Sequence, residues 1–278
     1  MQDRENQLLA FVDHLREEER SEGTTQKYLR DVRKFLSWLQ QRTLNKNEVS
    51  DWKAQLLSDG YAPETVNSMV VALNRFLSFI DRADCRVRTL RIQRKLFRRQ
   101  ERELTRSEYE RLVETAGGTG KERLALLLES IAATGIRVSE VQYLTVEAAR
   151  TGRTEISLKG KIRVILLPHK LCRKLLKYAR KQKTVSGQIF LTRNGKSMSR
   201  KQIWAEMKAL CKAAGIAADK VFPHNLRHLF AREFYKICRD VVKLADILGH
   251  SSIETTRIYL LSTGEEHVKQ LSQLRLIS

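Results

Sequence analysis

Four side chains near the end of the chain have the chemical types and the spacing that substitution at a phosphodiester requires. They lie in residues 223–228 and 248–259, and they are His224, Arg227, His250 and Tyr259. A guanidinium binds the charged nonbridging oxygens of a phosphodiester through paired hydrogen bonds. A tyrosine hydroxyl can attack phosphorus, although its ordinary pKa of ~10 means that it needs cationic neighbours or a base. The set predicts strand cleavage by Tyr259 without a metal ion, ATP or another cofactor.

Further side chains would complete such a site. Arg137 offers a second guanidinium, although a salt bridge to Glu140 at i+3 is an equally good reading of that residue. A leaving 5′ oxygen needs a proton donor, and Lys159 lies in a tight turn between two expected strands. We expect His224 to accept or share the tyrosine proton and His250 to hydrogen-bond the phosphate. Each residue has an ordinary structural reading when taken singly, and only their combination favours catalysis.

Two other patterns are weaker. His224 and His228 have the i, i+4 spacing of a zinc protease pair, but Asn225 stands where the water-activating glutamate belongs. Residues 117–121 resemble a phosphate loop that lacks its first glycine and its Ser or Thr, so they predict a turn between helices. The four cysteines have no paired spacing. We therefore expect no metal site and ordinary reduced thiols.

Charge is unevenly distributed along the 278 residues. Lys and Arg outnumber Asp and Glu by 52 to 32, which gives a formal net charge of +20. Residues 1–80 carry 11 basic and 12 acidic side chains, so the rest of the chain holds 41 of the basic and 20 of the acidic ones. The surplus predicts a polyanionic partner that binds mainly to the second part of the chain.

Residues 1–81 predict a compact helical domain. Apolar residues recur at helical spacing in four stretches, and Pro63 lies near the expected first turn of the fourth. The four stripes are Leu8, Phe11, Val12 and Leu15; Tyr28, Val32, Phe35, Leu36 and Leu39; Val49, Trp52 and Leu56; and Val66, Met69, Val70, Leu73, Leu77 and Ile80.

Residues 82–104 predict a basic interdomain linker. From Arg82 to Arg106 there are ten Arg or Lys residues, with only Asp84, Glu101 and Glu103 to offset them. A plain solvated linker is the alternative, but so many cations favour an anion lying alongside. The expected nucleic-acid contacts are Arg82, Arg86, Arg88, Arg91, Arg94, Lys95, Arg98 and Arg99.

Residues 105–278 predict a second, mainly helical domain with a small antiparallel sheet. Thr105 and Glu108 have capping-box spacing, and helices are expected to about residue 116, over 121–134 and from about 138. Residues 154–158 and 162–167 read as two strands around a tight turn.

The amino terminus lacks the basic stretch followed by an apolar stretch that marks a secretion signal, and no apolar run approaches the ~20 residues of a membrane span. We expect a cytoplasmic protein that associates with the nucleoid and not with membranes.

The chain resembles the tyrosine recombinases, the family of phage and transposon integrases. Its motifs follow the family order: Thr-Gly-Ile-Arg-Val-Ser-Glu at 134–140, the Lys159 hairpin, His-Asn-Leu-Arg-His at 224–228, Leu-Gly-His at 248–250, and a tyrosine nine residues later. The first domain resembles the family's core-binding, SAM-like domain. The resemblance covers essentially the whole chain.

This resemblance implies that Tyr259 forms a covalent 3′-phosphotyrosyl link and releases a 5′ hydroxyl. It implies inverted-repeat core sites on double-stranded DNA, a homotetramer on two paired sites, strand exchange through a Holliday junction, and accessory proteins that set direction. Val268, Leu271 and Leu274 fit a tail helix that docks either on a neighbouring protomer or on its own core.

Two departures from the family leave alternatives open. The hairpin is one residue shorter than the common family pattern, so Lys161 is an alternative to Lys159. The chain also begins almost at once with the core-binding domain, which favours a recombinase without an arm-binding domain. A type IB topoisomerase and a catalytically silent DNA-binding protein remain alternative functions.

Overall fold

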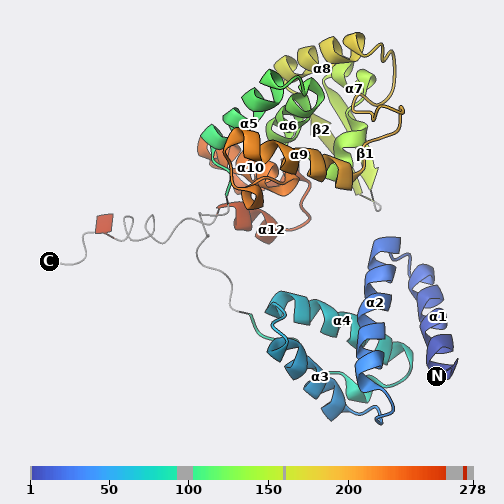
Figure 1. Ribbon diagram of the computed structural model, residues 1–278. Coiled ribbons are helices and arrows are strands. Elements are labelled where there is room, and N and C mark those ends of the chain that lie inside the picture. Colours follow the sequence, from blue (N-terminus) through green and yellow to red (C-terminus); the bar gives the residue numbers. More distant parts are fainter. Residues whose placement is uncertain (1, 93–102, 159–160, 261–271, 274–278) are drawn as a thin grey trace. The chain divides into compact units, whose positions relative to one another are not determined.

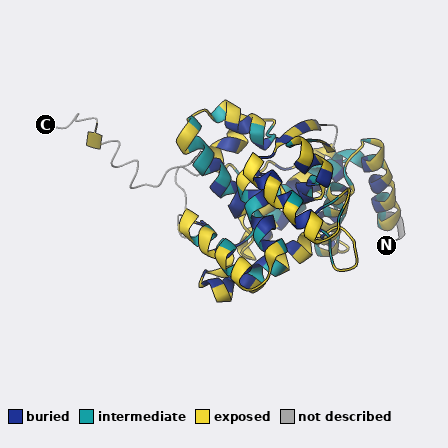
Figure 2. Cartoon of the chain, turned by 90° about the horizontal axis from the view of Figure 1, so that it is seen from above, coloured by how far each residue is buried: buried dark blue, intermediate teal, exposed yellow. Residues whose placement is uncertain are grey.

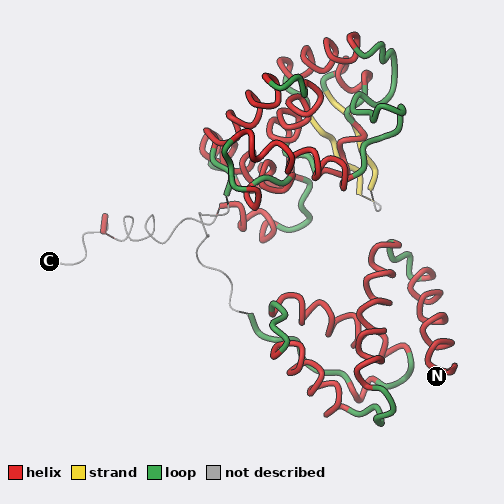
Figure 3. The backbone as a smooth tube through the Cα atoms, in the orientation of Figure 1, coloured by secondary structure: helices red, strands yellow, loops and turns green. Residues whose placement is uncertain are grey.

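A computed structural model describes residues 2–92, 103–158, 161–260 and 272–273 (Figure 1). The chain divides into two compact units, Met1–Arg94 and Lys95–Ser278. Helices dominate both units, and the only sheet in the described residues is one hairpin in the second unit (Figure 3). The predicted fold class, mainly helical with a small antiparallel sheet, is confirmed. No helix in the described ranges is both long and apolar enough to cross a membrane.

The first unit is a helical domain around an aromatic core. Phe11 packs edge-on against Phe76 with ring centroids 5.3 Å apart, and Phe35 packs in the same way against Trp52 at 5.2 Å. Every helix turns its apolar stripe inward, as its spacing predicts. The elements are α1 (Gln2–Glu17), α2 (Glu22–Leu39), α3 (Lys46–Ser58), α4 (Pro63–Phe79) and the 3₁₀ turn η1 (Ala83–Cys85).

Residues 82–92, which the sequence assigns to the linker, pack largely on the first unit. Val87 is 8% exposed and belongs to the aromatic core. Two asparagines of α4 bind the backbone of this segment: Asn74 hydrogen-bonds both the N–H and the carbonyl of Val87, and Asn67 does the same for Leu90. The segment is therefore fixed by polar contacts that its basic composition does not reveal.

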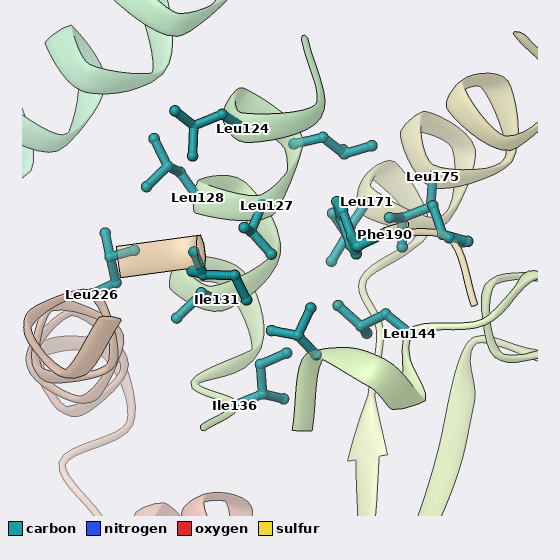
Figure 4. Close-up of a cluster of buried hydrophobic side chains, with 14 of the residues drawn as sticks. Leu124, Leu127, Leu128, Ile131, Ile136, Leu144, Leu171, Leu175, Phe190 and Leu226 are labelled. Atoms are coloured by element: carbon teal, nitrogen blue, oxygen red, sulfur yellow. The ribbon is translucent and has the colours of Figure 1, made fainter. Parts of the chain in front are cut away.

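The second unit surrounds helix α6 with other helices. Leu127 and Ile131 of α6 lie among side chains from α8, α10 and the loop that carries Phe190 (Figure 4). Helices of this unit carry buried residues along one face and exposed residues along another (Figure 2), and the buried residues are mainly apolar. The elements are α5 (Arg106–Gly118), α6 (Glu122–Thr134), η3 (Val138–Tyr143), α7 (Val146–Thr151), β1 (Arg153–Leu158), β2 (Lys161–Leu166), α8 (His169–Lys181), α9 (Arg200–Ala214), η4 (Ala218–Lys220), α10 (Pro223–Cys238), α11 (Val241–Leu248), α12 (Ile253–Arg257) and η5 (Ile258–Leu260).

Local signals are mostly confirmed in this unit. Thr105 and Glu108 form the predicted capping box at the start of α5. Strands β1 and β2 pair antiparallel from Arg153 opposite Leu166 to Leu158 opposite Lys161. The helix expected from about residue 138 is instead the 3₁₀ element η3, at whose start the Glu140 side chain accepts the backbone N–H of Arg137.

Candidate active site

Five of the six predicted catalytic residues meet in the second unit. Arg137 precedes η3, His224 and Arg227 lie in the first turns of α10, His250 follows α11, and Tyr259 lies in η5. Lys159 lies outside the described residues. The alternative, Lys161, begins β2, and only its backbone is described.

Arg227 is the buried centre of this group, with 1% of its surface exposed. Its Nη1 donates to the carbonyl of Gly135 at 2.5 Å, and its Nη2 donates to the carbonyl of Leu248 at 2.6 Å. These carbonyls lie at the carboxyl ends of α6 and α11, where the helix dipoles favour a cation. Burial and then the charge of Arg137 lower the pKa of Arg227 to about 10, and a hydrogen bond with Tyr259 opposes that shift. Arg227 is therefore a cation at neutral pH.

The glycines of the two motifs end these helices. Gly135 and Gly249 adopt φ values of 64° and 63°, the left-handed region that favours glycine. A Cβ at Gly135 would lie 2.4 Å from Phe230 Cδ1, and one at Gly249 would lie 2.4 Å from Arg163 Cδ. Gly135 therefore permits close packing of the end of α6 on Phe230, and Gly249 permits close approach of the end of α11 to Arg163.

Arg137 is held on one side and open on the other. Its Nη1 lies 2.9 Å from Glu140 Oε1, so the salt bridge that was the alternative reading is present. Its Nη2 also donates to the carbonyl of Gly249 at 3.3 Å. The side chain is nevertheless 42% exposed, which leaves guanidinium donors available to a ligand.

Sequence reasoning missed Arg163, the second arginine on Glu140. Arg163 Nη1 lies 2.9 Å from Glu140 Oε2, and its Nη2 donates to the carbonyl of Ile247 at 2.7 Å. Burial lowers the pKa of Arg163, while Glu140 opposes that shift. Its position gave a signal, because β2 turns Arg163 and Ile165 inward and exposes Ile162. A charge at an inward strand position indicates a buried polar contact.

Positive charge is in excess around Glu140 and Arg227. Arg137 and Arg163 share the carboxylate of Glu140, and Arg227 binds backbone carbonyls and His250. Three guanidinium groups therefore meet one carboxylate among the described neighbours. Such a preorganised surplus stabilises negative charge that develops on a bound group.

The side chains of His224 and His250 are both kept neutral at pH 7. Burial, then the charges of Arg227 and Arg137, lower the pKa of His250 to about 4. The same causes, in the same order, lower the pKa of His224 below its ordinary value of 6.5. Neutral imidazoles can accept protons at neutral pH.

Tyr259 is packed among three imidazole rings and is 4% exposed. The ring of His250 stacks on it at 5.6 Å, that of His224 lies at 5.9 Å, and that of His228 meets it edge to face at 4.4 Å. The sequence connected His228 only with a metal pair, whereas the structure places its ring against the tyrosine. No group of three or more metal-binding side chains occurs among the described residues.

The predicted linker contacts divide into three groups. Arg82 pairs with Asp84 at 3.1 Å, and Arg86 donates to the carbonyl of Ala83. Arg88 and Arg91 are exposed. Arg94, Lys95, Arg98 and Arg99 lie outside the described residues, as do Val268, Leu271 and Leu274 of the expected tail helix.

Known proteins resemble this chain over nearly all of its length. The phage integrase family matches residues 102–266, and its N-terminal SAM-like domain matches residues 8–84. Tyrosine recombinase XerC of Roseiflexus castenholzii is 30% identical over 91% of this chain and 88% of its own. Tyrosine recombinase XerA of Pyrococcus furiosus is 29% identical over 95% of this chain and 91% of its own.

Among solved structures, a lambda integrase dimer bound to a COC′ core site shares the fold. Its TM-score is 0.73 at 16% identity, over 92% of this chain and 94% of that one. The family model covers more than half of the sequence. Both relatives are named tyrosine recombinases, the family that the sequence motifs predict. The chain therefore belongs to the phage integrase family, the tyrosine recombinases.

Proposed function

We propose that this chain is a site-specific recombinase that cuts and rejoins double-stranded DNA at inverted-repeat core sites. The observation that carries the proposal is the meeting of Tyr259 with neutral imidazoles and a surplus of guanidinium groups. Related proteins support it, since lambda integrase was solved as a dimer on a core site.

The proposed chemistry is a transesterification. The Tyr259 oxygen attacks the scissile phosphorus and forms a 3′-phosphotyrosyl bond, while the bond from phosphorus to the 5′ oxygen breaks. His224 accepts the phenol proton, and Arg137 and Arg227 bind the nonbridging oxygens. Lys159 donates a proton to the leaving 5′ oxygen, with Lys161 as the alternative donor. A 5′ hydroxyl from the partner duplex reverses these steps, so no ATP is needed.

The proposed assembly follows from the inverted core sites. Each duplex binds two copies of the chain, two duplexes pair through a homotetramer, and exchange of one strand pair gives a Holliday junction. We also propose that the basic interdomain linker, residues 82–104, contacts DNA. Arg88 and Arg91, whose side chains are exposed, would make such contacts. Accessory proteins would set the direction of the reaction.

A covalent-trapping experiment tests the function. DNA that binds the chain is selected from a pool of random-sequence duplexes, and the selected duplex is resynthesised with nicks at successive positions. A nick beside the cleavage point lets the short leaving strand diffuse away, so the protein stays attached to DNA on a denaturing gel. We expect wild type to be trapped at Tyr259, as mapped by peptide mass spectrometry, and Tyr259→Phe to bind without being trapped.

Other outcomes of that experiment contradict the proposal. Equal behaviour of wild type and Tyr259→Phe would remove the nucleophile assignment and favour a silent DNA-binding protein. Relaxation of a supercoiled plasmid that lacks the selected duplex, without strand exchange between two plasmids that carry it, would favour a topoisomerase.

A further inference from the structure

A buried threonine contacts the candidate active site from the side opposite Arg227. Thr256 lies in α12, three residues before Tyr259, and none of its surface is exposed. Its Oγ1 lies 2.8 Å from His250 Nδ1. The other ring nitrogen, Nε2, lies 2.9 Å from Arg227 Nη2. The imidazole is therefore held at both nitrogens.

The chemistry of these partners determines which nitrogen carries the proton. A guanidinium has donors and no acceptor, so Nε2 must accept the hydrogen bond from Arg227. The lowered pKa of His250, about 4, makes the ring neutral at pH 7, with one N–H. That N–H must then be at Nδ1, and it donates to the Thr256 hydroxyl.

We infer that Thr256 is a positioning residue that anchors His250 by Nδ1 and so directs Nε2 toward the arginines that bind the phosphate. The inference rests on the proposed function and adds a residue to it. The ring torsion of histidine is broad, so rotamer preference alone does not fix the direction of Nε2. The anchor also fixes the stacking of His250 on Tyr259, whose ring planes lie 10° apart.

A hydroxyl suits this position for a second reason. A bound phosphate oxygen would compete for the Nη2 donor of Arg227 and leave Nε2 of His250 facing the phosphate. Nε2 can donate to that oxygen only when it carries the proton of the neutral ring and Nδ1 carries the lone pair. A threonine hydroxyl both accepts and donates, so it can pair with Nδ1 whether that nitrogen carries a proton or a lone pair. A methyl group of the same shape can do neither.

The test uses the full chain and the nicked duplex described above. Thr256→Val removes the hydroxyl and keeps the shape, whereas Thr256→Ser keeps the hydroxyl. Thr255→Val makes the same change at the exposed neighbour on the same helix and is the matched control. We expect Thr256→Val to slow single-turnover trapping by about 10- to 100-fold, the effect of leaving a buried donor unpaired. Thr256→Ser and Thr255→Val should stay within about 3-fold of wild type, and the affinity for the duplex should not change in any variant.

A measurement without DNA separates this inference from the proposed function. Nitrogen NMR of the histidine side chains at pH 7 should show His250 of wild type with its proton on Nδ1, and the Nδ1 signal should shift in Thr256→Val. A proton on Nε2 in wild type would overturn the inference even if trapping fails altogether. If wild type is trapped, two results overturn it: normal trapping by Thr256→Val, or equal slowing by the Val and Ser variants, which would show that only packing matters.

Discussion

The two units bury charge in opposite ways. In the first unit, the Asp31 carboxylate is 4% exposed and pairs with Lys27 and Arg30, whose side chains are 34% and 74% exposed. Around the candidate active site of the second unit, Arg163 and Arg227 are buried together with Glu140, and this one carboxylate serves two arginines. A buried anion matched by solvated cations needs no further partner. Buried cations in excess of their carboxylate form a centre prepared for an anion, as phosphodiester chemistry requires.

The largest effect is expected from removing Arg227, the most buried cation of the candidate active site. Arg227→Ala should lower the single-turnover trapping rate on bound duplex by about 10²- to 10³-fold, because a preorganised donor to the phosphate is lost. Arg227→Lys keeps the charge but not the fork that reaches two carbonyls, so it should recover only part of the rate. The exposed Arg150 on α7 gives the control, Arg150→Ala. An equal effect of the two alanine variants would show that only overall charge matters.

A smaller effect is expected from neutralising the carboxylates. Glu140→Gln leaves two arginines without their shared counter-charge, one of them buried, and should lower the free energy of unfolding by about 3 kcal/mol. Asp31→Asn leaves cations that water already solvates, so its cost should be about 1 kcal/mol. Urea unfolding that follows each unit by its own tryptophan signal measures both values. Equal losses would contradict the difference between the units.

A further expected effect is a dependence of stability on pH. The pKa of His250 is about 4 in the folded chain against an ordinary 6.5, so between these values the unfolded chain binds more protons. The melting temperature of the second unit should therefore fall as the pH falls through this range. His250→Gln keeps a donor and an acceptor but does not titrate, so its melting temperature should fall less steeply with pH than that of wild type. His169→Gln, at the exposed start of α8, is the matched control, and a His250→Gln curve parallel to that of wild type would contradict the cause given for the shift.

Local patterns were sufficient for most of the fold. Apolar spacing predicted α1 to α4, Pro63 marked the start of the last of these, and the capping box marked the start of α5. The 3₁₀ geometry of η3 was not predictable in this way, because the capping contact of Glu140 that begins it is of the same kind as the contact of Glu108 that begins the α-helix α5. The packing of residues 82–92 could not be predicted from local patterns either, because it depends on two asparagines of α4 that bind the backbone of that segment.

From the sequence we could predict which side chains are candidates for the reaction and where most of the helices lie, because those predictions depend on residue type and on a repeat of a few positions. The surroundings of these side chains depend on how distant segments of the chain pack. Arg227 binds a carbonyl 92 residues away, and Arg163 binds one 84 residues away. Such contacts depend on which helix ends meet, and no local periodicity encodes that meeting. Arg163 as the second partner of Glu140, and Thr256 as the partner of His250, could therefore be recognised only in the folded chain.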